Sequence, residues 1–363
     1  MLPALPVARV DDPPRSLADL MPPERNNFTA LRLLAASAVI VSHAGMQVTG
    51  VGEDQALART LVLSLGAHAV DLFFMLSGLT LAHSLAVRPD LRRFATRRAL
   101  RIFPGLVACA LAVAFLVGPA VTTRDVAGYL LSPGPYLYVL KTVSLATGDA
   151  RLPGVFENLP DAGRMNLSVW TLKYEAAVYV GLAALFLLGR LKRGAAGPLL
   201  AALLAGLVAA SFLAPRSEAE ITPAFHAVRL ATCFYAGVGL YALRDQVRLD
   251  PVTGLAVLAL FFGSIGTPME RVASYALTAG LIVGLGAVPL GRAREVLNRD
   301  DISYGTYLWG WPVSQLLLTA LSGLGPVGLA ALTLPFAWGL GLLSWRLVER
   351  PAMRSRGTHG SLA

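Results

Sequence analysis

The chain has 363 residues, of which 55% are hydrophobic and 15% charged, and its formal net charge is +9. Soluble domains are about one-quarter charged, so this composition excludes a soluble globule, a disordered chain and a coiled coil. Long apolar runs separated by short basic clusters are typical of a polytopic membrane protein made of helices. A transmembrane barrel would show alternating strands of about ten residues instead.

Residues 1–27 are polar and rich in proline, without the apolar segment that a signal peptide needs, and predict a flexible cytoplasmic tail. About ten apolar segments follow, each of about 20 residues and long enough to cross a bilayer. They lie near residues 28–48, 64–86, 102–121, 167–189, 195–215, 222–243, 251–268, 271–290, 302–322 and 326–346. The sequence therefore predicts an all-α transmembrane domain at 28–348 and a second cytoplasmic tail at 349–363.

The distribution of arginine and lysine predicts which side each loop faces, because cytoplasmic loops carry an excess of these residues. With both termini in the cytoplasm, roughly 21 basic residues fall inside and about 7 outside. The composition is typical of a GC-rich bacterium, so we expect the inner membrane. Cys109 and Cys233 lie inside apolar runs, which argues against a disulfide framework and against a thiolate zinc site.

Residues 122–166 form one long loop on the predicted outer side. Long loops in compact domains are usually functional or disordered. The sequence is compatible with a half-helix around residues 136–145, and the alternative is a disordered linker.

Six ionisable residues fall within the predicted helices, and each is a candidate for a functional site because a charge in the bilayer is costly. They are Arg32, His43, Asp71, Lys173, Glu175 and Arg229. Arg32 and His43 are eleven residues apart, close to three helical turns, so both project from one face about 16 Å apart. Arg32 is then expected near the cytoplasmic end and His43 near the outer end. The alternative is that both are interfacial polar residues.

Asp71 and Glu175 are expected at about the depth of His43, in the outer half of the membrane. A carboxylate beside an imidazole fixes its tautomer and raises its basicity, as a general base requires. The alternative is a structural hydrogen-bond cluster that joins helices. On the cytoplasmic side, Arg98 and Arg101 would share one face of a helical turn and suit phosphate recognition, or serve only as a positive-inside anchor. His68, His83 and His226 show no ligand spacing.

Several segments together resemble the acyltransferase 3 family of integral membrane acyltransferases, which includes bacterial O-acetyltransferases of surface polysaccharides. The matching segments are Arg32 to His43 (Arg-x10-His), Val70 to Gly78, Arg98 to Pro104 (Arg-x-x-Arg), Trp170 to Glu175 with Tyr179, Ile302 to Pro312, and Glu349 to Pro351. The resemblance covers residues 25–352. Many relatives carry histidine where this chain has Gly310.

The resemblance implies a role for each matched residue. His43 would be the catalytic base or a transient acyl-handling residue, Arg32 would help to place the acyl donor, and Glu175 and Asp71 would support the site. Arg98 and Arg101 would bind the phosphates of acetyl-CoA or another acyl-CoA. Candidates for further donor contacts are Ser77, Lys173 and Tyr304.

The implied reaction is transfer of an acyl group, with acetyl as the expected group, to a hydroxyl of a glycan or lipid-linked saccharide. No metal or nucleic acid is expected to take part, and a homo-oligomer is compatible with the sequence. The competing hypothesis is a transporter or flippase, which intramembrane charges and a long outer loop would also suit. A third is an inactive scaffold.

Overall fold

A computed structural model describes residues 15–58, 61, 63–146, 151–161, 163–187, 197–212 and 222–354. These residues form helices, turns and loops, and the only β pairing among them is one isolated bridge between Ser16 and Arg248. The predicted all-helical class is therefore confirmed. Of the predicted tails at 1–27 and 349–363, residues 1–14 and 355–363 lie outside the described residues.

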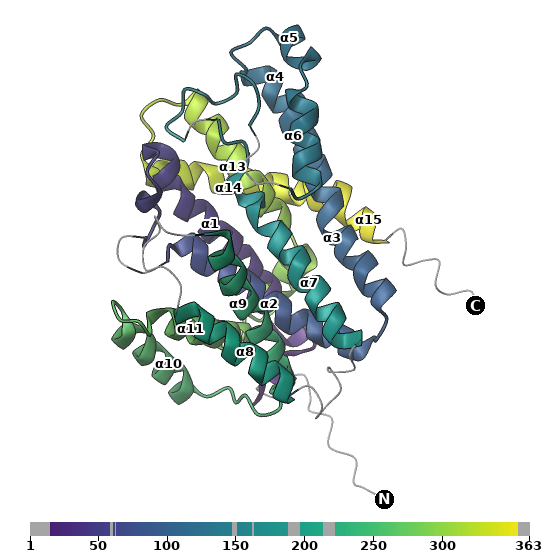
Figure 1. Cartoon of the computed structure of the whole chain (residues 1–363), viewed down its shortest axis with the longest axis vertical. Helices are drawn as coiled ribbons and strands as arrows, with labels where there is room; N and C mark the ends of the chain where they lie inside the picture. Colours follow the sequence, from purple (N-terminus) through teal and green to yellow (C-terminus); the bar gives the residue numbers. More distant parts are fainter. Residues whose placement is uncertain are drawn as a thin grey trace, which may run out of the picture.

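The first half of the chain contributes the helices coloured from purple to teal (Figure 1). Its helices are η1 (Leu17–Leu20), η2 (Pro23–Arg25), α1 (Phe28–Thr49), η3 (Gly52–Asp54), α2 (Leu65–Val87), α3 (Leu91–Ala112), η4 (Val113–Val117), α4 (Gly118–Val121), α5 (Val126–Leu131), α6 (Gly134–Val143), η5 (Leu167–Thr171) and α7 (Leu172–Leu187). Short polar side chains begin several of them: Ser64 caps α2, Asp90 caps α3 and Asp125 caps α5, each accepting a hydrogen bond from the backbone three residues later.

The second half completes the bundle with α8 (Gly197–Phe212), α9 (Pro223–Ala242), α10 (Pro251–Ser264), α11 (Glu270–Ala287), α12 (Arg292–Arg299), α13 (Ser303–Ala320), α14 (Pro326–Ser344), η7 (Trp345–Glu349) and α15 (Arg350–Arg354). Thr222 and Asp250 cap α9 and α10 in the same way, and each is followed by proline at the first helical position.

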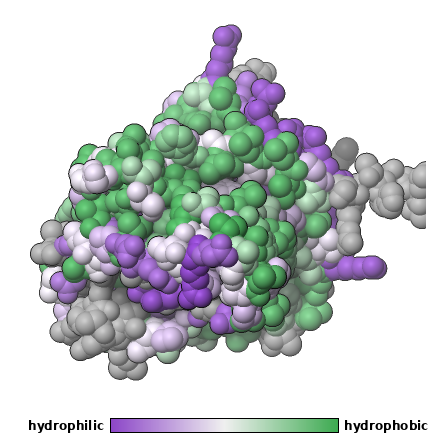
Figure 2. All heavy atoms as spheres, turned by 90° about the horizontal axis from the view of Figure 1, so that it is seen from above, coloured by the Kyte–Doolittle hydropathy of each residue, from purple (hydrophilic) through white to green (hydrophobic). Residues whose placement is uncertain are grey.

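Five helical stretches in the described part of the chain are long and apolar enough to cross a membrane. They are Phe28–Thr49, Leu65–Val87, Leu91–Val121, Leu167–Leu187 and Pro326–Arg354. The pair α11 and α12, bent by 117°, would make a sixth if it counts as one span, whereas α10 and the apolar part of α8 are shorter. Many large apolar side chains are exposed, such as Leu116, Val180 and Val327. Figure 2 shows apolar side chains over much of the visible face, as a lipid-facing surface requires.

The closest helix packing joins α2 to α9 and α13 to α14. A Cβ on Gly78 of α2 would collide with the backbone of Phe234, and a Cβ on Gly237 of α9 would collide with the backbone of Met75. Glycine is therefore required at both positions, because the two helices meet backbone to backbone, as small residues allow in membrane bundles.

Residues 15–27, expected to be part of a flexible tail, pack against the bundle. Leu17 and Leu20 are fully buried, and the backbone of Leu17 donates to the carbonyl of Val247 at 2.9 Å. Asn27 donates through Nδ2 to the carbonyls of Leu285 and Val288. This part of the expectation is wrong, because two apolar side chains among the prolines provide enough burial to hold the segment.

The described part of the 122–166 loop contains helices rather than a linker. α6 covers most of the expected half-helix and packs against α3. Tyr129 is fully buried and donates to the carbonyl of Ala114 at 2.7 Å. At the end of the loop, Asn166 donates to the carbonyl of Leu308 at 2.8 Å. The loop therefore returns into the bundle beside α13.

A buried ion pair crosses the contact between α2 and α9. Arg229 Nη1 lies 3.2 Å from Asp71 Oδ1, and the two side chains are 2% and 1% exposed. Arg229 also donates to the carbonyl of Ala67 at 3.2 Å. Such a pair is costly to break from one side, because the remaining charge stays buried without its partner.

We therefore expect Asp71→Ala and Arg229→Met, each made alone, to lower the free energy of unfolding by about 3–5 kcal/mol. The double variant Asp71→Leu/Arg229→Met should recover much of this loss, since apolar replacement of both partners is often neutral. Thermal unfolding in detergent measures both effects, with the exposed Arg92→Ala as the control. Single variants as stable as the wild type would show that the pair does not stabilise this contact.

Candidate active site

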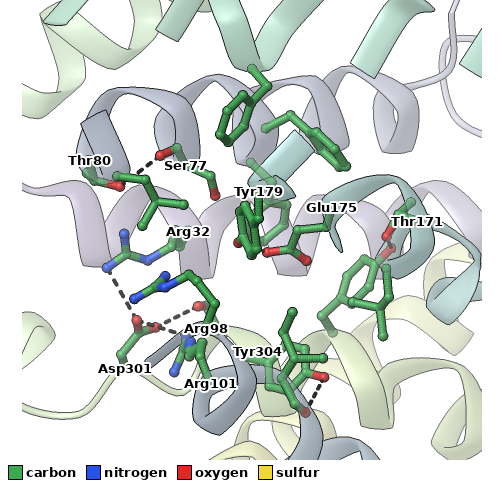
Figure 3. Close-up of a pocket in the computed structure, with 18 of the residues that line it drawn as sticks. Arg32, Ser77, Thr80, Arg98, Arg101, Thr171, Glu175, Tyr179, Asp301 and Tyr304 are labelled. Carbon is green, nitrogen blue, oxygen red and sulfur yellow. Dashed lines mark hydrogen bonds and ion pairs between the residues drawn. The ribbon is translucent and has the colours of Figure 1, made fainter. Parts of the chain in front are cut away.

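A cavity of about 330 Å³ lies between α1, α2, α3, α7 and α13. Its apolar wall includes Phe73, Phe74 and Phe234. The polar side chains around it include Arg32, Ser77, Thr80, Arg98, Arg101, Glu175, Tyr179, Asp301 and Tyr304 (Figure 3). Six of the nine residues that the sequence identified line the cavity: Arg32, Ser77, Arg98, Arg101, Glu175 and Tyr304.

Asp301 connects the arginines at one end of this cavity. Arg32 Nη2 lies 3.2 Å from Asp301 Oδ2, and Arg101 Nη2 lies 2.9 Å from the same oxygen. Ser303 donates to the other carboxylate oxygen at 2.6 Å. Burial alone would raise the pKa of Asp301, but Arg101 and Arg32 hold it well below its ordinary value. An ionised Asp301 thus joins the start of α1, the first half of α3 and the start of α13.

Arg101 contacts two carboxylates and two aromatic rings. Its Nη1 lies 3.3 Å from Glu349 Oε2, and its guanidinium lies over the rings of Tyr304 and Trp345, at 5.7 and 5.6 Å from their centroids. Glu349, predicted to begin a cytoplasmic tail, is fully buried and accepts a hydrogen bond from Ser344 at 2.8 Å. Two carboxylates already balance the charge of Arg101.

Arg98 differs from Arg101 although both come from α3. In the described part of the chain, Arg98 has no carboxylate at ion-pair distance. Its buried Nε has no hydrogen-bond partner, and its side chain is hydrogen-bonded to Tyr179. α3 begins at Leu91, so both arginines lie well within a helix, three residues apart, as the expected helical turn requires. Arg98 therefore presents the less compensated positive charge to the cavity (Figure 3).

Glu175 lies in the arginine cavity and accepts a short hydrogen bond from Tyr179 one turn later on α7. The cavity that contains Glu175 does not include His43, in contrast to the expected grouping of the two residues. Asp71 is likewise engaged elsewhere, in the ion pair with Arg229. The expectation failed because depth along a helix says nothing about the direction in which a side chain projects.

His43 lies outside the cavity, further along α1. Its ring makes an edge contact with Trp311 of α13, with centroids 5.2 Å apart, and the side chain of Gln55 is its hydrogen-bond partner. The buried Nδ1 has no partner among the described residues. One ring nitrogen of His43 is thus held, and the other is unpaired.

The cavity extends from the arginines to Tyr307 and Thr171. Its far end includes Tyr307 and Thr171, whose hydroxyls lie 2.9 Å apart, and Phe73 lies against Tyr307. Tyr307 precedes Trp311 by four residues, about one turn of α13. The distance from the arginines to His43 is about 16 Å along α1. Only one helical turn therefore separates the end of the cavity from the contact between His43 and Trp311.

The remaining candidates divide between the cavity and the surface. Ser77 lines the cavity, as does Tyr304, whose hydroxyl donates to the carbonyl of Ile102 at 2.8 Å. Lys173 is exposed, with its ammonium 5.1 Å from the ring centroid of Tyr174. Lys173 therefore does not reach the cavity.

Gly310 is packed against α1. A Cβ at this position would lie 2.6 Å from Cγ1 of Ile40. The side chain of Ile40 therefore fills the space that a larger residue at position 310 would need. A histidine there would require Ile40 to move or to be smaller.

Sequence reasoning missed Asp301, Glu349, Gln55 and Trp311 as members of this region. Asp301 carried the clearest signal, an acidic residue directly before a predicted span. Glu349 and Trp311 lie in segments that match the family, but no role was assigned to them, and Gln55 carried no signal. Within the described residues, no group of three or more His, Cys, Asp or Glu side chains is arranged to hold a metal ion.

Comparison with known proteins agrees with the arrangement of motifs. A family model described as an acyltransferase domain (acyltransferase 3) matches residues 25–345. An O-acetyl transferase of Shigella phage Sf6 is 31% identical over 341 residues, which cover 90% of this chain and 95% of that protein. Nodulation protein 10 of Rhizobium leguminosarum bv. viciae is 27% identical over 360 residues, 92% of this chain and 94% of that protein.

No solved structure gives a significant match. The family model nevertheless spans the bundle from the start of α1 to the end of α14, and with it Arg32, His43, the arginine pair of α3 and the Glu175 helix. The chain therefore belongs to the acyltransferase 3 family.

Proposed function

We propose that the protein transfers an acyl group, with acetyl as the first candidate, from acyl-CoA to a hydroxyl of a surface glycan or lipid-linked saccharide. Family membership and the similarity to an O-acetyl transferase support O-acyl transfer. The assignment of the donor and of the base rests on the arrangement along α1. Arginines lie at one end of the cavity, and His43, with an unpaired ring nitrogen, lies about three helical turns further on.

The arginine end suits the phosphates of the donor. Phosphate groups are recognised by guanidinium groups through charge-assisted hydrogen bonds. Arg98 is the principal phosphate ligand in this proposal, because the charges of Arg101 and Arg32 are shared with Asp301. Arg101 is then a structural residue that holds α3 against α13, η7 and Asp301. The pantetheine arm would pass along the apolar wall toward His43.

His43 is the proposed general base. It accepts the proton of the acceptor hydroxyl as that oxygen attacks the thioester carbonyl. The carbon–sulfur bond breaks, an ester forms, and the coenzyme A thiolate leaves and takes up a proton. Gln55, rather than a carboxylate, orients the imidazole in this scheme.

The membrane topology belongs to the same proposal. About ten spans with both termini in the cytoplasm would place the arginine end inside and His43 toward the outer face of a bacterial inner membrane. The excess of basic residues on the proposed inner side supports this orientation. The basic experiment incubates the purified protein in detergent with labelled acetyl-CoA and follows its hydrolysis and acyl transfer.

We expect His43→Ala to lower the rate of acyl transfer by about 10²–10⁴-fold, because a general base contributes about that much. The rate with purified protein and labelled acetyl-CoA gives the measurement. His83→Ala is the matched control, since His83 is a second partly buried histidine whose ring packs against Tyr241 outside the cavity. A near-normal rate for His43→Ala at a normal unfolding temperature would contradict the role of His43.

Arg98→Ala should raise the KM for acyl-CoA by about tenfold to a hundredfold with a smaller change in kcat, because phosphate contacts far from the thioester contribute mostly uniform binding. Arg97→Ala is the control, since Arg97 is the exposed neighbour on the same helix.

Arg101→Ala should instead lower the unfolding temperature, because it leaves Asp301 and Glu349 without their shared partner. The prediction separates two arginines that lie one turn apart. A larger donor KM for Arg101→Ala than for Arg98→Ala, without loss of stability, would reverse their assignments.

Donor and acceptor should enter from opposite faces. Proteoliposomes with the protein in a single orientation, acyl-CoA inside and a membrane-impermeant glycan outside should yield acylated glycan. The control vesicles carry His43→Ala. Product that forms only when both substrates are on the cytoplasmic face would contradict transfer of the acyl group across the membrane. It would leave the proposed O-acyl transfer itself intact.

A further inference from the structure

Beyond His43 and Trp311, the facing sides of α1 and α13 carry two buried amide side chains. Gln47 is 1% exposed and Gln315 is 0% exposed. Neither was a candidate from the sequence, and neither lines the arginine cavity. They are neutral polar groups, in contrast to the charged groups at the other end of the same two helices.

The two helices run in the same direction and in register. Arg32 near the start of α1 pairs with Asp301, which lies just before α13, and His43 contacts Trp311 further along both. Gln47 follows His43 by four residues, and Gln315 follows Trp311 by four. Residues four apart share a helix face, so both amides lie about one turn beyond the contact between His43 and Trp311, on the side away from the arginines.

The end of the long loop closes over this face of α13. The carbonyl of Arg164 accepts from Trp311 Nε1 at 3.0 Å and from Gln315 Nε2 at 3.4 Å. The side chain of Arg164 is occupied by an ion pair with Asp161 at 3.1 Å. The loop thus contributes a backbone contact to Gln315, and its charge is neutralised locally.

Several buried polar atoms of this region have unmet hydrogen bonds. In the part of the chain that is described, Gln47 Nε2, Gln315 Oε1 and His43 Nδ1 have no partner. Buried polar groups in native proteins are normally paired, because an unpaired one is costly. Together the three atoms offer a donor, an acceptor and a base.

Two buried amides at the start of α1, Asn26 and Asn27, are fully paired. Asn26 donates to the carbonyls of Leu20 and Pro22 and accepts from the backbone of Phe28. The Nδ2 of Asn27 makes two hydrogen bonds, and its Oδ1 accepts from Arg294. Asn166 Oδ1 and Asn298 Oδ1 also lack a partner among the described residues, so unmet hydrogen bonds occur outside this region too. Gln47 and Gln315 differ from them in their position, one helical turn beyond the contact between His43 and Trp311.

We propose that Gln47 and Gln315 bind the hydroxyl groups of the acceptor and so determine acceptor specificity. This inference rests on the proposed O-acyl transfer. An alcohol both donates and accepts, and neighbouring hydroxyls of a saccharide would match an amide donor and an amide acceptor. The donor phosphates do not suit this position, because they require cations, and the arginines lie on the far side of His43.

The chemistry follows from this placement. One hydroxyl of the saccharide donates its proton to His43 Nδ1 as its oxygen attacks the thioester carbon. The carbon–sulfur bond breaks, and the imidazolium of His43 returns this proton to the coenzyme A thiolate. The amides hold neighbouring hydroxyls and so select which oxygen reaches His43. They are specificity-determining residues, and hydrolysis of the donor by water does not need them.

The test compares Gln47→Leu and Gln315→Leu with the wild type. The acceptor is the surface glycan of the producing cell, freed of O-acyl groups by mild base, and the donor is labelled acetyl-CoA. We expect the KM for the glycan to rise about tenfold or more, while acetyl-CoA hydrolysis without glycan stays within about twofold. Thr319→Val is the control, since Thr319 lies one turn further on α13 with its hydroxyl bonded to the carbonyl of Gln315.

Thermal unfolding distinguishes a loss of glycan binding from a loss of protein stability. Gln47→Leu removes a buried amide with an unmet hydrogen bond, so the unfolding temperature should not fall. An unchanged glycan KM, or a loss of stability in proportion to the loss of transfer, would overturn the role of the two amides. A wild-type protein that fails to acylate the glycan at all would instead overturn the proposed function.

Discussion

A single carboxylate, Asp301, holds the charged end of this bundle together. It accepts from Arg32 at the start of α1 and from Arg101 of α3, and Arg101 in turn reaches Glu349 after α14. Four helices far apart in the sequence are joined by two acids and two bases. Because these charges compensate one another, the adjacent Arg98 remains the less neutralised cation in the cavity. Arg101 can join these helices because a guanidinium has several donors and a flat face, so it can bind two carboxylates and stack on aromatic rings at the same time.

The register that Asp301 sets between α1 and α13 determines what lies beyond it. Since the two helices begin together and run in parallel, His43 meets Trp311, and Gln47 and Gln315 follow at the next turn. Polarity therefore changes along one helix pair, from cations to an imidazole to neutral amides. This order suits a phosphate-bearing donor at one end and a hydroxyl acceptor at the other. The Tyr307 and Thr171 hydroxyls, 2.9 Å apart, line the cavity. In the proposed function, the donor arm passes them to reach His43.

Buried charge serves two purposes in this protein. The Asp71–Arg229 pair is almost fully enclosed between α2 and α9 and lies outside the cavity, so it is a packing element. The arginines of the cavity are instead partly exposed, at 25% for Arg32 and 17% for Arg101. The same residue types thus have different roles, which depend on access to the cavity. The close contact of Gly78 and Gly237 brings α2 and α9 near enough for the buried pair to form.

The amino-acid sequence by itself determined the helical class, because long apolar runs leave the backbone no other way to satisfy its hydrogen bonds in lipid. It also determined that Arg32 and His43 share one face of α1, since helical periodicity is local, and the order of its motifs identified the family. The partners of these residues depended on tertiary packing. Asp71 pairs with Arg229, and Glu175 lies in the cavity with the arginines. Asp301 pairs with Arg32 and Arg101, and Gln55 is the partner of His43, which only the tertiary structure shows. Which side chains meet across helices depends on the rotation and register of each helix, and these are set by contacts between residues that lie hundreds of positions apart.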